Sequence, residues 1–284
     1  MGAGEIRAIL ERHGLLAHRD RGQNFLVSEA LAERLVDLAG IEAGDRVLEI
    51  GTGLGLLTRA LARRADRVVT LEVDAGLVRA LRAEGLLPDG VELRHEDALR
   101  ADLPALVAEL GPRAKLLANL PYAISGPLLR RVLDLRGVLA DWSVMLQREV
   151  AERILARPGT KAYGSLSVLH QLTVTARRAL ELEPGSFWPV PQVRSSFLRI
   201  APRADAPLAC AELARVERFV RAAFSKRRKT LANALRAGGL PAPLAAGRVE
   251  AALAALGLDP RVRAEALAPE ELLALARALA PEAA

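Results

Sequence analysis

Residues 46–55 read Arg-Val-Leu-Glu-Ile-Gly-Thr-Gly-Leu-Gly, and this stretch decides the fold. Its apolar run predicts a buried strand over 46–50, and its three alternating glycines predict a sharp turn into a helix over 56–61. The same alternation of patterns predicts helices at 5–12, 30–39 and 75–84, and further strands at 67–72, 91–95, 115–119, 142–147, 166–176 and 196–200. Strands that alternate with helices indicate an α/β fold with a parallel, doubly wound sheet.

A smaller domain is expected after residues 201–207, Ala-Pro-Arg-Ala-Asp-Ala-Pro, which contain two prolines and show no periodicity. We therefore divide the chain into an α/β domain over 1–203 and an all-α domain over 204–284. The all-α domain is expected to form four helices, at 210–224, 226–236, 245–256 and 269–280. Ser225 is the predicted N-cap of the second of these, because a continuous helix would place Arg227 on its apolar stripe.

The composition excludes several classes of protein. Cys210 is the only cysteine, which excludes an intramolecular disulfide, a Cys-rich zinc site and an Fe–S cluster, and fits a reducing cytoplasm. The four histidines lack the spacing of metal ligands, so no metal site is expected. No signal peptide or membrane span is predicted. The 40 basic residues, of which only four are lysine, give a net charge of +6, which suits a phosphate-rich partner or reflects a GC-rich genome.

Three features place a ligand at the carboxyl ends of the first strands. Gly51, Gly53 and Gly55 follow the acidic Glu49 in a G-x-G-x-G pattern, which is typical of S-adenosylmethionine-dependent methyltransferases and differs from the G-x-G-x-x-G of NAD-binding folds. Glu72 ends the second strand, where a carboxylate can accept both ribose hydroxyls. Asp97 follows the third strand, where it can accept from an adenine amino group. A nicotinamide cofactor can use the same ribose acid, so these acids alone leave the cofactor open.

The tetrapeptide Asn119-Leu120-Pro121-Tyr122 follows the fourth predicted strand. The exocyclic N6 of adenine is a poor nucleophile, and two acceptors aimed at its hydrogens favour the tetrahedral geometry that methylation needs. The Asn119 side-chain oxygen and the Leu120 carbonyl can supply these acceptors, because Pro121 offers no N–H. Tyr122 can stack on a base that has left its helix. The alternative is an ordinary Asn-Pro turn beside a core tyrosine.

Phe187 supplies a second aromatic side chain, in the proline-stiffened stretch Phe-Trp-Pro-Val-Pro-Gln-Val-Arg-Ser over 187–195. We expect Phe187 and Tyr122 to sandwich a flipped base, and Asn119 to face the same cavity beside the glycine turn. Trp188 is expected to close the junction between the domains instead. The alternative is that Phe187 and Trp188 both fill that junction.

Taken in order, these motifs resemble those of the ribosomal RNA adenine N6-dimethyltransferases, most closely the KsgA type that acts on small-subunit rRNA. The resemblance covers about four-fifths of the chain and rests on the glycine turn and on residues 23–26, 71–74, 96–99, 119–122, 147–150, 164–168, 187–196 and 224–233. It implies a class I methyltransferase sheet of the Rossmann-like kind, S-adenosylmethionine as cofactor, and two methyl transfers to each of two adjacent adenosines in a hairpin near the 3′ end of 16S rRNA. By motif match it assigns the cofactor to Asn24, Leu26, Gly51, Glu72, Asp97 and Asn119, and the target base to Asn119, Leu120, Tyr122 and Phe187.

The resemblance also turns two basic clusters into candidate RNA contacts, although a charged run is usually a solvated surface. These are Arg19 and Arg21 near the cofactor loop, and Lys226, Arg228 and Lys229 in the second domain. The expected partner is immature small ribosomal subunits, and the enzyme is expected to be a cytoplasmic monomer that serves ribosome biogenesis.

Four other readings compete with this one. A large-subunit rRNA adenine methyltransferase shares the early motifs, but residues 187–195 and 224–233 favour the small-subunit type. A DNA adenine methyltransferase would be expected to carry a separate target-recognition region. A non-catalytic assembly factor need not keep Asn119 and Glu72. A nicotinamide dehydrogenase is disfavoured by the glycine spacing.

Overall fold

The computed structural model describes residues 1–17, 23–121, 124–240 and 247–280. The chain divides into two compact units. The first contains Met1–Ala151 and Arg177–Pro202, and the second contains Glu152–Ala176 and Arg203–Ala284. The second unit resumes at Arg203, one residue before the predicted start of the all-α domain at 204, and it also contains 152–176, which the sequence prediction places in the α/β domain.

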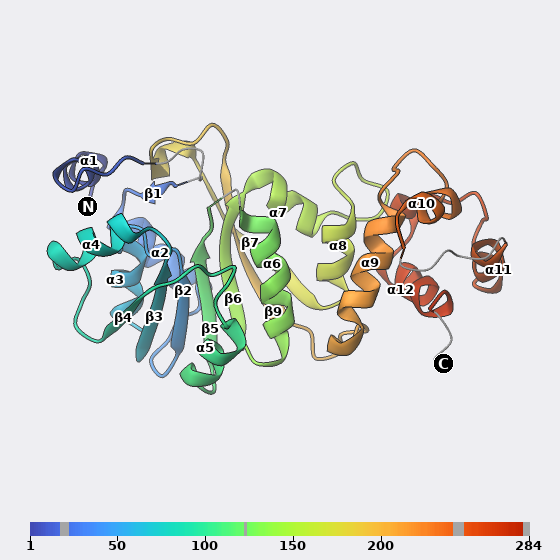
Figure 1. The fold of residues 1–284 in the computed structure, drawn as a ribbon, viewed down its shortest axis with the longest axis horizontal. Coiled ribbons are helices and arrows are strands. Elements are labelled where there is room, and N and C mark those ends of the chain that lie inside the picture. The colour runs from blue at the N-terminus through green and yellow to red at the C-terminus, as the bar shows by residue number, and fades with distance from the viewer. Residues whose placement is uncertain (18–22, 122–123, 241–246, 281–284) are drawn as a thin grey trace. The chain divides into compact units, whose positions relative to one another are not determined.

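A seven-stranded sheet forms the centre of the first unit, in the order β4-β3-β2-β5-β6-β9-β7 (Figure 1). Its strands are β2 (Arg46–Ile50), β3 (Arg67–Glu72), β4 (Val91–His95), β5 (Ala114–Asn119), β6 (Asp141–Gln147), β7 (Val174–Leu182) and β9 (Ser195–Pro202). Strands β2 to β6 are parallel, as predicted, whereas β9 runs antiparallel to β6. The chain moves outward from β2 to β4 and then returns to the other side of β2 with β5. This reversal is the position where open α/β sheets bind ligands.

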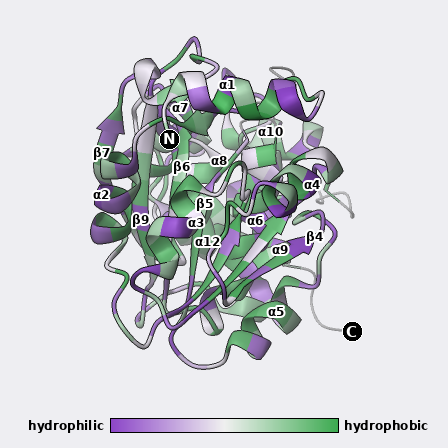
Figure 2. Ribbon diagram, turned by 90° about the vertical axis from the view of Figure 1, so that its left-hand side faces the viewer, coloured by the Kyte–Doolittle hydropathy of each residue, from purple (hydrophilic) through white to green (hydrophobic). Residues whose placement is uncertain are grey.

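Helices cover both faces of this sheet. They are α1 (Ala3–Arg12), α2 (Glu29–Ala39), α3 (Leu56–Ala62), α4 (Ala75–Ala83), α5 (Leu103–Leu110), α6 (Ser125–Asp134) and α7 (Arg148–Leu155). Figure 1 shows α5 and α6 in front of the strands and α2 and α3 behind them. Hydrophobic and hydrophilic segments alternate along α1 in Figure 2, as expected of an amphipathic helix. The Ser28 hydroxyl caps α2, and the Asp74 carboxylate caps α4.

A short second sheet joins the N-terminal segment to the loop before β9. Strand β1 (Phe25–Leu26) pairs antiparallel with β8 (Phe187–Trp188), so that Phe25 lies opposite Trp188 and Leu26 opposite Phe187. Phe25 and Trp188 pack with residues of α1, and the Arg7 guanidinium lies 5.9 Å from the centre of the Trp188 ring. Trp188 therefore packs against a cluster within the first unit.

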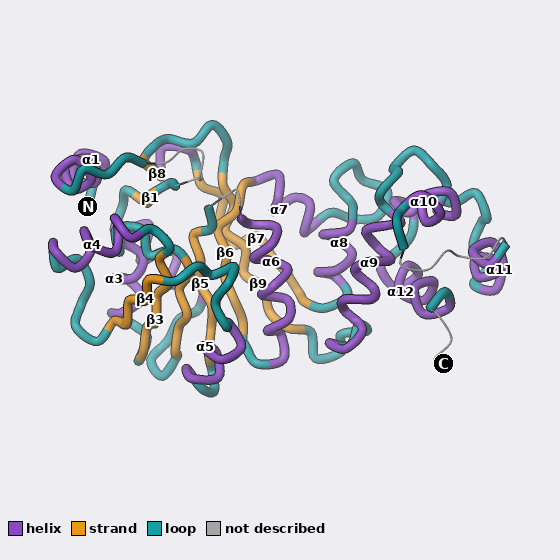
Figure 3. Tube along the Cα trace, viewed as in Figure 1, coloured by secondary structure: helices purple, strands orange, loops and turns teal. Residues whose placement is uncertain are grey.

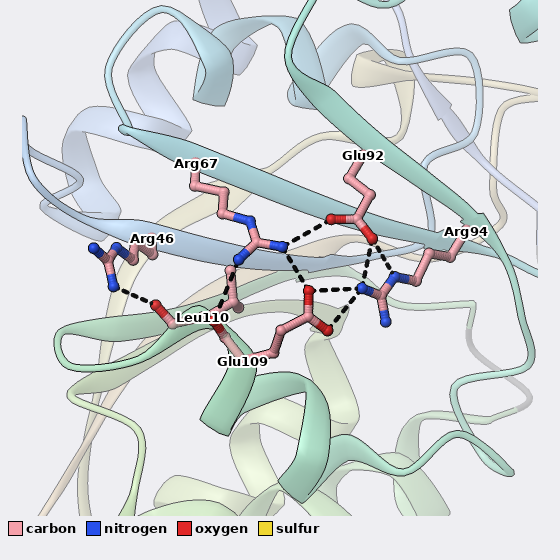
Figure 4. Close-up of polar contacts among 6 residues, drawn as sticks. All are labelled: Arg46, Arg67, Glu92, Arg94, Glu109 and Leu110. Atoms are coloured by element: carbon pink, nitrogen blue, oxygen red, sulfur yellow. Dashed lines mark hydrogen bonds and ion pairs between the residues drawn. The ribbon is translucent and has the colours of Figure 1, made fainter.

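Strand β4 forms one edge of the sheet, and a network of ion pairs lies along this edge. The Arg67 and Arg94 guanidinium groups bind the carboxylates of Glu92 on β4 and Glu109 on α5 (Figure 4). Such a network discourages another strand from pairing with an exposed edge. Nearby, Arg46 donates from Nη1 to the carbonyl oxygen of Leu110 at 2.8 Å.

The second unit is mainly helical, as Figure 3 shows. Its helices are α8 (Ser165–Gln171), α9 (Leu213–Ala223), α10 (Leu231–Ala237), α11 (Arg248–Ala255) and α12 (Pro269–Ala278). Tyr163 is buried and ties this unit together, because its hydroxyl donates to the Leu267 carbonyl at 2.9 Å and its ring meets Phe224 edge-on at 5.7 Å.

Two local predictions fail in this unit. The predicted strand over 166–176 is instead helix α8, and β7 starts only at Val174. The apolar residues Val168, Leu169 and Leu172 are buried at a helical spacing, so the pattern of this stretch fits a helix as well as a strand. The predicted N-cap at Ser225 is also wrong, because α10 begins at Leu231 and Thr230 accepts from the Asn233 N–H.

Candidate active site

A cavity of about 420 Å³ opens at the carboxyl ends of β2, β3 and β5, where the chain order reverses. This volume falls within the range of small-molecule sites. Most of the residues that line it are apolar. The sequence-predicted residues among them are Asn24, Leu26, Gly51, Gly53, Glu72, Asp97, Asn119, Leu120 and Pro121. The fold therefore brings together the acids, the glycine turn and the start of the Asn-Leu-Pro-Tyr motif.

The glycine turn makes room for a ligand. Gly51 has φ +88°, and a Cβ there would lie 3.3 Å from the Asn119 carbonyl oxygen. Gly53 has φ +58°, and a Cβ there would lie 3.2 Å from the Phe25 ring. Gly55 differs, because it is the N-cap of α3 and does not line the cavity. Gly51 and Gly53 thus shape the cavity wall, and Gly55 shapes the turn behind it.

Glu72 is held rigidly at the end of β3. Its Oε2 accepts from the Gly53 N–H and its Oε1 from the Asp74 N–H, each at 2.9 Å. Burial raises the pKa of this carboxyl, and the backbone N–H groups oppose the shift. Each carboxylate oxygen has a second lone pair, so Glu72 can accept two more hydrogen bonds from a ligand in the cavity.

Glu49 lies elsewhere than predicted. The residue is fully buried and does not line the cavity. Its Oε2 accepts from the hydroxyls of Thr58 at 2.6 Å and Thr70 at 2.7 Å, while Oε1 has no hydrogen-bond partner among the described residues. Burial raises the pKa of Glu49 to about 7. The Thr70 hydroxyl lies 2.7 Å from that of Thr52, a cavity residue, so Glu49 reaches the cavity only through two threonines.

Asp97 sits in a loop that another helix holds in place. Its Oδ1 accepts from the Leu99 N–H at 2.9 Å. Arg131 on α6 donates from Nη1 to the Ala98 carbonyl and from Nη2 to the Ala101 carbonyl, both at 2.6 Å. The guanidinium therefore bridges the loop that contains Asp97.

Asn119 ends β5 with its side chain fixed. Its Nδ2 donates to the Asn24 carbonyl oxygen at 3.0 Å. Because a carbonyl oxygen can only accept, this bond requires Nδ2 to face Asn24 and places Oδ1, the acceptor, on the other side of the amide. Asn24 thus lines the cavity, and its carbonyl oxygen holds the Asn119 amide in place.

The residues after Asn119 are brought to the cavity in part. Leu120 and Pro121 line it. The Pro121 carbonyl accepts from the Ile124 N–H and the Ser125 hydroxyl, whereas the Leu120 N–H donates to the Met145 carbonyl at 3.3 Å. Tyr122 lies outside the described residues.

Phe187 does not line this cavity. Its side chain is only 2 % exposed and packs in the core cluster that includes Leu26. The physical reason is the pairing of β8 with β1, which places Phe187 opposite Leu26. Phe187 supports a cavity residue from behind.

The predicted RNA contacts give a mixed result. Lys226, Arg228 and Lys229 are all exposed. Arg19 and Arg21 lie outside the described residues. Sequence reasoning missed three residues that shape the cavity: Gln23 and Thr52 in its wall, and Arg131 behind it. Gln23 and Thr52 are neighbours of predicted residues, but nothing in the sequence distinguishes Arg131 from the other arginines.

Comparison with known proteins identifies the family. The family model for ribosomal RNA adenine dimethylase matches residues 14–280. This chain belongs to that family. The dimethylase is 43% identical over 267 residues to the ribosomal RNA small subunit methyltransferase A of Geobacter metallireducens, which covers 94% of this chain and 96% of that protein. It is 40% identical over 284 residues to the protein of the same name from Geobacillus kaustophilus, which covers 98% of this chain and 96% of that protein.

Solved structures share the fold of this chain. A dimethyladenosine transferase from Plasmodium falciparum superposes with a TM-score of 0.74 at 24% identity, covering 88% of this chain and 95% of that one. The 23S rRNA methyltransferase ErmE superposes with a TM-score of 0.64 at 28% identity, covering 90% of this chain and 99% of that one. The predicted class I methyltransferase fold is confirmed. The dimethylase is an rRNA adenine N6-dimethyltransferase, and S-adenosylmethionine is its methyl donor.

The cavity of the dimethylase suits this donor. The backbone at Gly51 and Gly53 packs so closely that a Cβ would press on Asn119 or Phe25, and Glu72 keeps acceptors available for hydroxyl groups. Among the described residues, no cluster of three or more histidine, cysteine, aspartate or glutamate residues is arranged to hold a metal ion. No helix in the described part of the chain is long and apolar enough to cross a bilayer.

Proposed function

We propose that this enzyme transfers two methyl groups to each of two adjacent adenosines in a hairpin near the 3′ end of 16S rRNA. The substrate would be the immature small subunit, and the reaction would form part of small-subunit biogenesis in the cytoplasm, performed by a monomer. One observation supports this proposal most directly. The chain is 43% identical to a small-subunit rRNA methyltransferase over 94% of its length, whereas it is 28% identical to the 23S rRNA methyltransferase ErmE. The single cysteine of the chain suits a reducing compartment.

The acceptor chemistry rests on Asn119 and Leu120. The lone pair of adenine N6 is delocalised into the ring, so methylation needs acceptors that draw its hydrogens out of the ring plane. The bond to the Asn24 carbonyl holds Oδ1 of Asn119 ready for one hydrogen. The turn at Ser125 engages the carbonyl of Pro121, which leaves the Leu120 carbonyl as the second acceptor. Pro121 adds no competing N–H.

The cofactor contacts are proposed from the cavity wall. Glu72 would accept both ribose hydroxyls, Asp97 the adenine amino group, and Gly51 and Gly53 would let the ligand approach the backbone. Asn24, Leu26 and Asn119 would line the methionine side. S-adenosylmethionine brings an already activated sulfonium methyl, so the protein needs to position the nitrogen rather than supply a strong base.

Tyr122 remains the proposed stacking partner of the base. Phe187 is proposed to act indirectly, by supporting Leu26, since its own ring is buried in the core. Glu49 likewise is proposed to act through Thr70 and Thr52 on the glycine turn.

The test is methylation of small ribosomal subunits that lack the modification. The enzyme is incubated with these subunits and S-adenosylmethionine, and the 3′ fragment of 16S rRNA is analysed by mass spectrometry. We expect two dimethylated adenosines side by side in one hairpin. Methylation of large-subunit rRNA instead, or of a lone adenosine, would overturn the proposed substrate.

A further inference from the structure

A buried acid beside the cofactor cavity lacks a positive partner. Glu49 is fully buried, and its hydrogen bonds from the Thr58 and Thr70 hydroxyls both end on the same oxygen, Oε2. Its Oε1 has no hydrogen-bond partner in the part of the chain that the structure describes. Of the described charged groups, Glu72 is the one that shifts the pKa of Glu49, and it is an acid. An ionised carboxylate in such surroundings is costly unless a positive charge lies near it.

Asp45 shows how the same fold treats a buried acid that is paired. Its side chain is equally buried, yet Lys115 lies 2.7 Å from Oδ2 and Arg113 lies 3.1 Å from Oδ1. Burial alone would raise the pKa of Asp45, but its hydrogen bonds, first of all the one from Lys115, hold it below its ordinary value. Glu49 thus lacks the countercharge that the protein supplies to Asp45.

Glu49 lies close to the ligand cavity although it does not line it. On β2 it stands opposite Thr70 of β3, and Glu72, a cavity residue, follows two residues later on the same side of that strand. The other neighbouring elements contribute uncharged side chains, Leu117 opposite Glu49 on β5 and Thr58 on α3. A charge in the cavity is therefore felt by Glu49 together with Glu72.

A chain of hydroxyl groups connects Glu49 with the cavity. With Glu49 ionised, the Thr70 hydroxyl donates its one proton to the carboxylate, so the Thr52 hydroxyl must donate to Thr70 across their 2.7 Å contact. Thr52 lines the cavity. A proton on Glu49 can leave by this route: it passes to Thr70, the proton of Thr70 passes to Thr52, and that of Thr52 passes to water.

We propose that Glu49 distinguishes the methyl donor from the product by charge, because its carboxylate favours the sulfonium cation of S-adenosylmethionine over the neutral thioether of S-adenosylhomocysteine. Apart from the transferred methyl group and its charge, the two ligands are the same. A positive charge in the cavity stabilises the ionised form of Glu49, so the donor expels its proton and the product lets the proton return. By linkage, ionised Glu49 holds the donor more tightly relative to the product. The inference rests on the proposed indirect role of Glu49 in the cofactor site and is independent of the RNA substrate.

The first experiment compares the two ligands by calorimetry between about pH 5.5 and 8.5. The readout is the Kd of the product divided by the Kd of the donor, in which effects on shared groups of the ligands cancel. For the wild type we expect this ratio to rise about 3- to 10-fold with pH and to level off above about 7, where Glu49 is ionised in every state. Glu49→Gln keeps the shape but cannot ionise, so its ratio should stay near the wild-type value at low pH. A rise that persists undiminished in this variant comes from Glu72 and refutes the inference.

Two threonine variants of nearly unchanged shape separate charge from packing. The Thr58 hydroxyl stabilises the ionised form of Glu49, so Thr58→Val should move the rise to higher pH by about one unit. Thr52→Val breaks the chain of hydroxyl groups but keeps the charge, so the height of the rise should remain. If Glu49 acts through packing alone, Thr58→Val will not displace the rise. Urea unfolding establishes that each variant is folded.

Proton release tests the same idea in the unmodified protein. Near pH 7, titrations in buffers of different ionisation enthalpy should show more protons released by the donor than by the product. Equal release by the two ligands, or a ratio of Kd values that does not change with pH, overturns the inference. Neither result affects the proposed rRNA site, which mass analysis of methylated subunits tests separately. Failure of both ligands to bind would overturn the inference and the proposed cofactor contacts together.

Discussion

Arg131 offers a sharp test of how the cofactor site is built. The variant Arg131→Met keeps most of the aliphatic stem and removes the two bonds to the Ala98 and Ala101 carbonyls. Each bond is 2.6 Å long and comes from a charged donor. At the lower end of the range for such bonds, about 1.5 kcal/mol each, their combined contribution is about 3 kcal/mol.

Only part of that free energy should appear as lost cofactor affinity. The Asp97 carbonyl still accepts from the Arg100 and Ala101 N–H groups at 2.8 Å, and Oδ1 still accepts from Leu99. We therefore expect about half, or about 1.4 kcal/mol, which is a tenfold weaker Kd. Calorimetry with S-adenosylhomocysteine measures it, and small-subunit affinity should stay unchanged.

Two comparisons make the result decisive. Arg46→Met removes an arginine-to-carbonyl bond elsewhere in the same unit and should leave cofactor affinity unchanged (Figure 4). Arg131→Met combined with Asp97→Ala should cost little more than Asp97→Ala alone, because both act on one contact. Fully additive losses, or an unchanged Kd in the single variant, would show that Arg131 does not position Asp97.

Three further predictions address other parts of the molecule. Asn119→Ala should lower kcat at least 100-fold in single-turnover methylation, with cofactor Kd within a few-fold, because it removes an acceptor that acts in the transition state; near-normal turnover would exclude that role. Because burial raises the pKa of Glu49 to about 7, its folded form holds a proton that the unfolded chain releases near 4.5, so stability falls as pH rises between these values. Glu49→Gln should remove about 3 kcal/mol of that fall, and urea unfolding of both proteins at pH 5 and pH 8 would show equal pH dependence if this assignment is wrong. Lys115→Met should destabilise the fold by about 3 kcal/mol in the same assay, because the fully buried Asp45 carboxylate then loses a partner at 2.7 Å, and a change below 1 kcal/mol would contradict this.

The sequence predicted the parts of the fold that depend on local pattern. The strands at 46–50, 67–72 and 91–95 match the structure to the residue, because each contains Val and Leu in a short stretch that directly follows Gly or Asp. The stretch 166–176 failed because the same apolar residues satisfy a helix and a strand, and packing decides between them. The start of α10 was misplaced since Arg227 bonds to a carboxylate distant in sequence.

In the candidate site, too, the sequence predicted what depends on local pattern and missed what depends on packing. Glu72, Asp97 and Asn119 were identified because each lies at the carboxyl end of a strand or two residues beyond it, and parallel strands bring their carboxyl ends together. Glu49 was misplaced because side chains alternate along a strand, and its position turns it toward Thr58 and Thr70. The sequence could not show that Phe187 lies outside this cavity, because its pairing partner, β1, is only two residues long and carries no periodic signal.

The contact between Gly51 and the Asn119 carbonyl has a practical consequence for re-engineering this enzyme. A Cβ at Gly51 would lie 3.3 Å from the Asn119 carbonyl oxygen, so a side chain at this glycine would press on the residue that we propose to orient the acceptor nitrogen. Enlarging the cavity for donors with bulkier transferable groups should therefore begin at other lining residues, such as Leu77 or Leu99, where a smaller side chain creates space and leaves Gly51 and Asn119 unchanged. Any substitution at the glycine would alter donor capture and nucleophile alignment in a single step.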